Sequence, residues 1–182
     1  KGRVAGALVK VVACVLKPGN DHGEYRSGET AYAAAMGQLA YYRLLASQGE
    51  ATVLATREAF AAHMAAWSNA TDYSEMPVGF VIGMEGADAI VWPEQVREWW
   101  KLGLRVISLS HYGFSAYSHG TATGTDGGLF PPARPLLEEM DKLGMILDVS
   151  HTSDASVREE LEIFSGPLLG SHQNCRAVTP GE

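Results

Sequence analysis

The stretch MILDVSH (145–151) shows the pattern that decides the fold: a short apolar run that ends in a side chain able to bind a metal ion, here His151. Three further runs end in the same way: VGFVIGM (78–84) before Glu85, LRVISLS (104–110) before His111, and PLLGS (167–171) before His172. The carboxyl ends of parallel strands open onto one face of an α/β domain, where such proteins keep their chemistry. One carboxylate and three imidazoles are therefore expected in one pocket, which favours a metal-dependent hydrolase.

Strand and helix patterns alternate along the whole chain. Apolar and β-branched runs predict strands, and apolar residues at helical spacing predict the helices between them. The expected strands are 4–16, 51–55, 78–84, 104–110, 145–150 and 167–171; the expected helices are 29–47, 57–67, 93–102, 132–143 and one that Ser153 or Asp154 caps and that reaches about residue 164. This βαβα order, with strands apolar on both faces, indicates a parallel sheet.

The predicted fold class is α/β, and we expect a (β/α)8 TIM-type barrel of the metallo-dependent hydrolase kind. No GxGxxG motif follows the first strand, so nothing supports a dinucleotide-binding fold. A complete barrel takes roughly 250 residues, whereas this chain has 182. We therefore expect a single domain over residues 1–182 that contains only part of the barrel and is truncated at both ends.

Charge and composition argue against several kinds of partner. The net charge is −7 and no run of basic residues occurs, which disfavours nucleic acid and anionic membranes. No apolar stretch reaches the ~20 residues that a membrane-spanning helix needs. Cys14 and Cys175 form no CxxC motif, so neither a disulfide framework nor a cysteine metal site is expected. We expect a soluble protein, and the sequence leaves its compartment open between the bacterial cytoplasm and export.

Glu85, His151 and His172 are the candidate metal ligands. A carboxylate that follows an apolar strand is costly to bury unless it is paired or binds a metal. His151 and His172 lie one β/α unit apart, so neighbouring strands can bring both imidazoles to one ion, and imidazole with carboxylate is a ligand set of zinc. The alternative is a Glu85 that caps a helix or forms a salt bridge, with two histidines packed at the rim of the sheet.

His111 and Asp148 each have several open roles. His111 ends its strand and begins the long loop 112–130, so it is a candidate metal ligand, proton shuttle or hydrogen-bond donor to an oxyanion, and packing explains it equally well. Asp148 precedes His151 by three residues. It is a candidate for a residue behind the metal ligands that orients them, and burial in the core is the alternative.

Five segments in the correct order resemble the membrane dipeptidase family of metallopeptidases, peptidase family M19. They are residues 83–86 for G-x-E-G, 108–111 for L-T-H, 127–129 with 138–145 for G-G-L and E-M-N-R-L-G-M, 146–153 for L-x-D-L-S-H-x-S, and 171–174 for S-H-S-N. The match runs from Val78 to Cys175, over half of the chain. Any one of these motifs is weak evidence, but five in this order are specific.

The resemblance implies a zinc-dependent dipeptidase that hydrolyses the amide bond of a small dipeptide with a hydroxide that bridges two zinc ions. In the family, the glutamate matched by Glu85 bridges both ions, and the histidines matched by His151 and His172 ligate one of them. The histidine matched by His111 contacts substrate, and we expect Tyr112 beside it in the substrate site. The implied partners are the dipeptide and, in a homodimer, a second copy of the chain.

The sequence departs from the family in one respect that bears on the metal. The His-x-Asp pair that ligates the other zinc on the first barrel strand does not occur here, and the family's substrate-binding arginine and late-strand aspartate would fall beyond Glu182. Two alternatives therefore stay open. The first is another amidohydrolase-type metal hydrolase that cleaves an amide, a lactone or an ester. The second is a catalytically incomplete barrel fragment that only binds a ligand.

Overall fold

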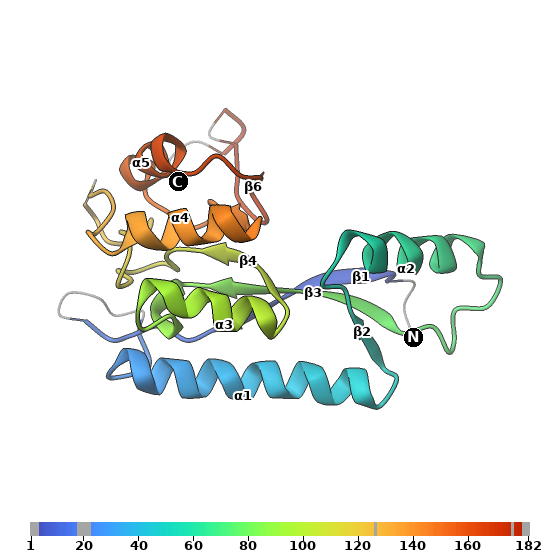
Figure 1. Cartoon of the computed structure of the whole chain (residues 1–182). Helices are drawn as coiled ribbons and strands as arrows, with labels where there is room; N and C mark the ends of the chain where they lie inside the picture. Colours follow the sequence, from blue (N-terminus) through green and yellow to red (C-terminus); the bar gives the residue numbers. More distant parts are fainter. Residues whose placement is uncertain (1–3, 18–22, 126, 176, 180–182) are drawn as a thin grey trace.

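The computed structural model describes residues 4–17, 23–125, 127–175 and 177–179. Strands alternate with helices, as the sequence predicts (Figure 1). The strands are β1 (Gly6–Val12), β2 (Ala51–Val53), β3 (Val78–Glu85), β4 (Leu104–Ser108), β5 (Ile146–Asp148) and β6 (Leu168–Leu169). The α-helices are α1 (Gly28–Ser47), α2 (Arg57–Asn69), α3 (Val96–Lys101), α4 (Ala133–Leu143) and α5 (Asp154–Ile163), and short 3-10 helices occur at η1 (Ala87–Ala89) and η2 (Pro93–Gln95).

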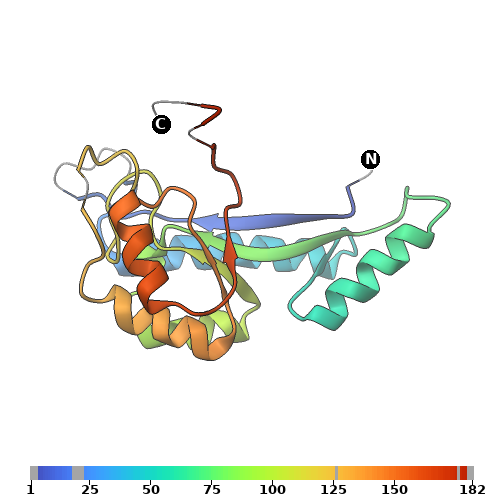
Figure 2. The ribbon, with the colours of Figure 1, turned by 90° about the horizontal axis from the view of Figure 1, so that it is seen from above.

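The strands of the described residues form one parallel sheet in the order β1-β3-β4-β5-β6, and β2 pairs with the first part of β3. Apart from β2, spatial order follows chain order. Helices α1, α3 and α4 lie on the same side of this sheet (Figures 1 and 2). A doubly wound fold would place helices on both faces. Sequential strands with an outer layer of helices are instead the arrangement of a (β/α) barrel, the expected fold class.

The face of the sheet away from these helices carries two layers of side chains. The first layer is apolar and lines a hollow; it includes Leu8, Val81, Val106, Ile146 and Leu169. Side chains alternate between the two faces of a strand, so residues two or four positions after these apolar residues lie on the same face. They form the second layer, which is polar and lies toward the carboxyl ends of the strands: Lys10, Glu85, Asp148 and Ser171.

The main core lies between the sheet and its helices. Trp99 of α3 and Leu136 and Met140 of α4 are fully buried, and they belong to one apolar cluster with Ile107 and Leu147 of the sheet. Burial of this kind contributes roughly 1.5–3 kcal/mol for each large side chain. It fixes the sheet from behind and so holds the strand ends in place. Within the described ranges, no helix is long and apolar enough to cross a lipid bilayer.

Five of the six described strands end two to four residues earlier than the sequence predicts: β1, β2, β4, β5 and β6. β1 ends at Val12, which pairs with Glu85, the last residue of β3. At this point the side chain of Gln38 in α1 accepts a hydrogen bond from the Val12 N–H and donates one to its carbonyl. β6 ends at Leu169. Beyond it, the Ser171 N–H donates to Oδ1 of Asp148 and not to a neighbouring strand. At both ends a polar side chain that is distant in sequence forms hydrogen bonds with the backbone, and local sequence patterns do not reveal this.

Helix α5 contains one buried acidic side chain that has no hydrogen-bond partner among the described residues. Glu160 is 0% exposed, and neither oxygen of its carboxyl group has a hydrogen-bond partner among the described residues. Burial, and after it the negative charge of Asp148, raise the pKa of Glu160 from 4.5 to about 8. The side chain is therefore protonated in the folded protein at neutral pH, because the neutral form is far less costly to bury.

We expect Glu160→Gln to stabilise the protein at pH 8 more than at pH 4.5. The folded-state pKa is raised, so the contribution of Glu160 to stability is fully present below pH 4.5 and is lost as the pH rises through about 8. Glutamine has nearly the same shape and cannot ionise. Urea unfolding at the two pH values measures the difference, and Glu162→Gln on the exposed side of α5 is the control. An equal gain at both pH values would contradict the argument.

Candidate metal centre

The four predicted residues lie at one end of the sheet. β3 ends at Glu85, and each of the three histidines lies three residues beyond the end of its own strand: His111 after β4, His151 after β5 and His172 after β6. Because the strands are parallel and adjacent, this equal spacing brings the side chains to the same edge. The sequence-based prediction that they converge is confirmed.

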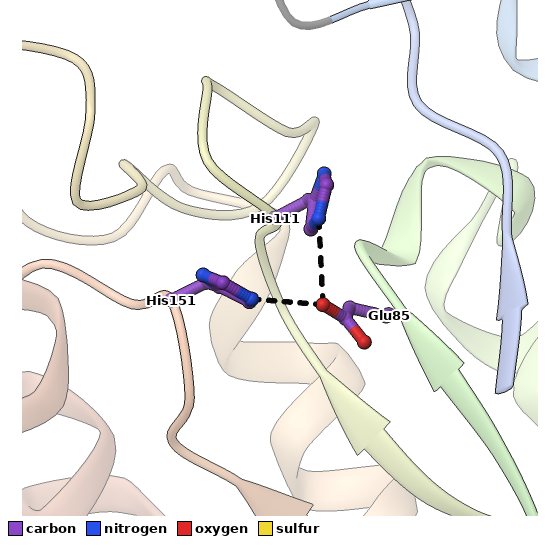
Figure 3. Close-up of side chains that lie close together, drawn as sticks. All are labelled: Glu85, His111 and His151. Carbon is purple, nitrogen blue, oxygen red and sulfur yellow. Dashed lines mark ion pairs between the residues drawn. The ribbon is translucent and has the colours of Figure 1, made fainter. Parts of the chain in front are cut away.

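One carboxylate oxygen is the meeting point of the three imidazoles. Oε1 of Glu85 lies 2.9 Å from Nε2 of His151, 3.3 Å from Nε2 of His172 and 3.4 Å from Nε2 of His111. Figure 3 shows His111 and His151 approaching Glu85 from two different loops. The glutamate is only 8% exposed. His111 and His172 are thus about equally close to this oxygen, so position alone does not separate a metal ligand from a substrate contact.

The backbone of His151 adopts a conformation that L-residues rarely take. Its φ is 65°, and it is the non-glycine residue with positive φ in the described part of the chain. Such a conformation costs on the order of 1–3 kcal/mol and persists where the surroundings enforce it. Here the His151 carbonyl accepts hydrogen bonds from the Thr121 N–H and from the Ser110 hydroxyl. The turn directs the imidazole back over the sheet, toward Glu85.

A chain of hydrogen bonds fixes the orientation of His172. The hydroxyl of Ser171 donates to Oδ2 of Asp148 at 2.5 Å and lies 2.7 Å from Nδ1 of His172. A carboxylate only accepts, so the hydroxyl proton points to Asp148, and Nδ1 of His172 must be the donor to Ser171. This tautomer leaves the lone pair of Nε2 free and directs it toward Glu85 and His151. Metal-binding histidines are commonly oriented in this way.

Asp148 is the buried anchor of this chain. It is 0% exposed and accepts hydrogen bonds from the Ser150 N–H, the Ser171 N–H, the Ser171 hydroxyl and Lys10. Burial alone would raise its pKa, but these hydrogen bonds outweigh burial and hold the pKa well below its usual range. Asp148 lies behind the histidines and is linked to His172 through the hydroxyl of Ser171. Its position agrees with the predicted supporting role, which stays a prediction.

Lys10 belongs to the same cluster, and sequence reasoning missed it. Its ammonium nitrogen lies 2.8 Å from Oδ2 of Asp148, 3.0 Å from Oε2 of Glu85 and 3.0 Å from the hydroxyl of Ser171. Only 11% of its side chain is exposed. The sequence feature that could have identified it is a single lysine inside an otherwise apolar strand. Lysine is almost never fully buried without a partner, so such a residue indicates a carboxylate on the same face of the sheet.

Tyr112 lies at the rim of the cluster. Its ring centroid is 4.4 Å from that of His151 and 4.6 Å from that of His111, and the residue is exposed. It therefore borders the imidazoles from the solvent side. This position suits a residue that contacts a bound molecule, and its predicted part in substrate binding stays a prediction.

The donor set fits a divalent metal ion. Burial opposes the ionisation of Glu85, yet hydrogen bonds from His151 and Lys10 lower its pKa to about 2. Nε2 of His151 lies 2.7 Å from Nε2 of His172, and both lie close to an ionised oxygen. Such lone-pair atoms approach one another only around a proton or a cation. Glu85, His111 and His151 also offer ligand atoms within 4.8 Å of one another, and nitrogen with oxygen ligands suits zinc.

Comparison with known proteins decides the family. The model of the membrane dipeptidase family, peptidase family M19, matches residues 28–182. The chain belongs to the membrane dipeptidase family. Its relatives include dipeptidase verJ of Clonostachys rogersoniana, which is 34% identical over 105 residues, 56% of this chain and 27% of that protein. Dipeptidase 3 of Mus musculus is 33% identical over 106 residues, 54% of this chain and 21% of that protein.

Solved structures share the fold of this membrane dipeptidase family chain. A metallo peptidase from Rhodobacter sphaeroides, liganded with a phosphinate mimic of the dipeptide L-Ala-D-Ala, superposes with a TM-score of 0.74 at 22% identity and covers 97% of this chain and 54% of its own. An amidohydrolase from Pseudomonas aeruginosa gives 0.75 at 17% identity, with coverages of 97% and 48%. The chain thus spans about half of these solved chains and about a quarter of the curated relatives.

We expect Ser171→Ala to release the tautomer of His172. Without the hydroxyl, Nδ1 loses its acceptor, so the proton is no longer held on that nitrogen. Nitrogen-15 spectra of histidine-labelled, metal-free protein at a pH where imidazoles are neutral distinguish the two tautomers. The unaltered protein should show His172 protonated at Nδ1, and the variant a mixture. Ser68→Ala, on the exposed side of α2, is the control; an unchanged His172 signal in Ser171→Ala would contradict the assignment.

Proposed function

We propose that this chain forms the zinc-binding part of a dipeptidase that hydrolyses the amide bond of a small dipeptide. The observation that carries the proposal is the meeting of three imidazoles on one buried, ionised carboxylate oxygen at the carboxyl ends of parallel strands. Membership of the membrane dipeptidase family supports the same reaction. This activity is proposed for the full-length protein, because the similar proteins are about twice as long as this chain or longer.

In this proposal Glu85, His151 and His172 hold the zinc ion. Glu85 supplies Oε1, and the two histidines supply Nε2, the nitrogens that already face this oxygen. The hydrogen-bond chain from Asp148 through Ser171 keeps the His172 lone pair in position. When bound, zinc polarises a carbonyl group and lowers the pKa of a water molecule to near neutrality, which provides the hydroxide that the reaction needs.

His111 and Tyr112 act on the substrate. His111 begins the loop over the strand ends, and its ring lies against that of Tyr112 at the solvent side of the cluster. From this place the imidazole can donate a hydrogen bond to the carbonyl oxygen of the scissile bond as that oxygen gains negative charge. A dipeptide-like ligand is recorded for the similar metallo peptidase from Rhodobacter sphaeroides, which supports a dipeptide as the substrate of this protein.

Two rival functions remain distinguishable by experiment. The similarity to an amidohydrolase from Pseudomonas aeruginosa rests on fold alone, so a related hydrolase of amides, lactones or esters is the first rival. A barrel that only binds a ligand is the second. Assay of the full-length, zinc-loaded protein against a panel of dipeptides, lactones and esters separates them. Selective hydrolysis of dipeptides supports the proposal, and the absence of any hydrolysis contradicts it.

We expect His151→Gln to lose bound zinc, because the amide replaces an imidazole ligand and leaves the ion under-coordinated. His63→Gln is the matched control. His63 lies on α2, where its Nε2 contacts the Ala5 carbonyl at the opposite end of β1 from the cluster. Elemental analysis of the full-length variants after dialysis measures zinc per chain. If His151→Gln retains as much zinc as the control, His151 is not a ligand.

We expect His111→Ala to keep its zinc and its fold but to lose activity. A hydrogen bond that is made mainly in the transition state affects turnover, and its removal typically lowers kcat by roughly 10²–10³-fold. Zinc content, thermal unfolding and dipeptide hydrolysis should be measured on one preparation of the full-length enzyme. Loss of zinc together with activity would make His111 a metal ligand, and full activity would make it a packing residue.

A further inference from the structure

Lys10 lies in a cage of oxygen atoms of the kind that binds cations. Its ammonium group contacts Oε2 of Glu85, Oδ2 of Asp148 and the hydroxyl of Ser171, all between 2.8 and 3.0 Å away. These oxygens come from different strands or strand ends, β3, β5 and the segment after β6. Two carboxylate oxygens and a hydroxyl that converge on one point are ligands that hard divalent cations also accept.

The two oxygens of Glu85 face different cations. Oε1 faces the imidazoles of His111, His151 and His172, and Oε2 faces the ammonium of Lys10. A carboxylate that bridges two metal ions offers one oxygen to each of them. In this chain the second oxygen already has a positive partner, and that partner is fixed by Asp148 at 2.8 Å.

The ammonium group of Lys10 also opposes a second ion. It lies between the two carboxylates of the cluster, those of Glu85 and Asp148, and only 11% of the lysine side chain is exposed. A second divalent ion beside Oε2 would add two positive charges within a few ångströms of a buried ammonium, where water screens little of the repulsion.

We propose that the ammonium of Lys10 occupies the position of a second cation, so that this centre binds one divalent ion, on the Oε1 side of Glu85, where the family resemblance predicts two. The inference rests on the proposed metal-binding function and specifies its stoichiometry. Lys10 holds Glu85 and Asp148 in place and is not itself a ligand, because an ammonium group has no lone pair.

The test is the number of zinc ions that the full-length protein binds. Metal-free protein is saturated with zinc, freed of excess by gel filtration, and analysed for zinc per chain. The unaltered protein should bind one ion. Lys10→Gln removes the positive charge beside Oε2 of Glu85 and Oδ2 of Asp148 and should bind two ions. Lys10→Arg keeps the charge and should bind one. Lys101→Gln, which alters an exposed lysine at the end of α3, should bind one and is the matched control.

Each outcome separates this inference from the function on which it rests. Two ions in the unaltered protein would overturn the inference and leave the zinc site standing, and so would a single ion in a folded Lys10→Gln. No zinc in the unaltered protein would contradict the proposed function itself. A second measurement needs no variant: with cobalt(II) in place of zinc, electron paramagnetic resonance should show an isolated high-spin ion at saturation, and a magnetically coupled pair would overturn the inference.

Discussion

The carboxylate of Glu85 is ionised and almost fully buried, and its charge must be compensated inside the protein. A buried carboxylate without a partner would cost several kcal/mol. Lys10 in β1 and His151 after β5 donate hydrogen bonds that compensate it, and the histidines that follow β4 and β6 lie against the same carboxylate. Because these segments are neighbours in the sheet, the same interactions that stabilise the charge also fix the relative positions of the strand ends.

The polar cluster at the strand ends is supported by apolar packing on both faces of the sheet. Apolar side chains fill the middle of the sheet's inner face, and the helices of the outer layer pack against its back. Between them, Asp148 and Ser171 set the orientation of His172 before any ligand arrives. A site whose donors are already oriented loses little free energy on reorganisation, which favours tight metal binding and stabilises charge that develops during a reaction.

The sequence predicted the convergence of Glu85 and the three histidines because that prediction needs only two facts. Apolar runs mark strands, and parallel strands end on one face. It could not place Lys10, because the choice of face depends on register: Lys10 lies beside Gly83 of β3, on the same side as Glu85. The hydrogen bonds between the side chain of Gln38 in α1 and the backbone of Val12 could not be predicted either, since the two residues are distant in sequence. Long-range polar contacts have no local pattern.

Anomalous diffraction from crystals of the zinc-loaded, full-length protein, recorded on both sides of the zinc absorption edge, tests the metal centre most directly. We expect an anomalous peak about 2.0–2.2 Å from Oε1 of Glu85 and from Nε2 of His151 and His172, the usual zinc–ligand distances. If the peak is absent, or lies away from Glu85 while the imidazoles remain hydrogen-bonded to its carboxylate, these residues do not form a metal site.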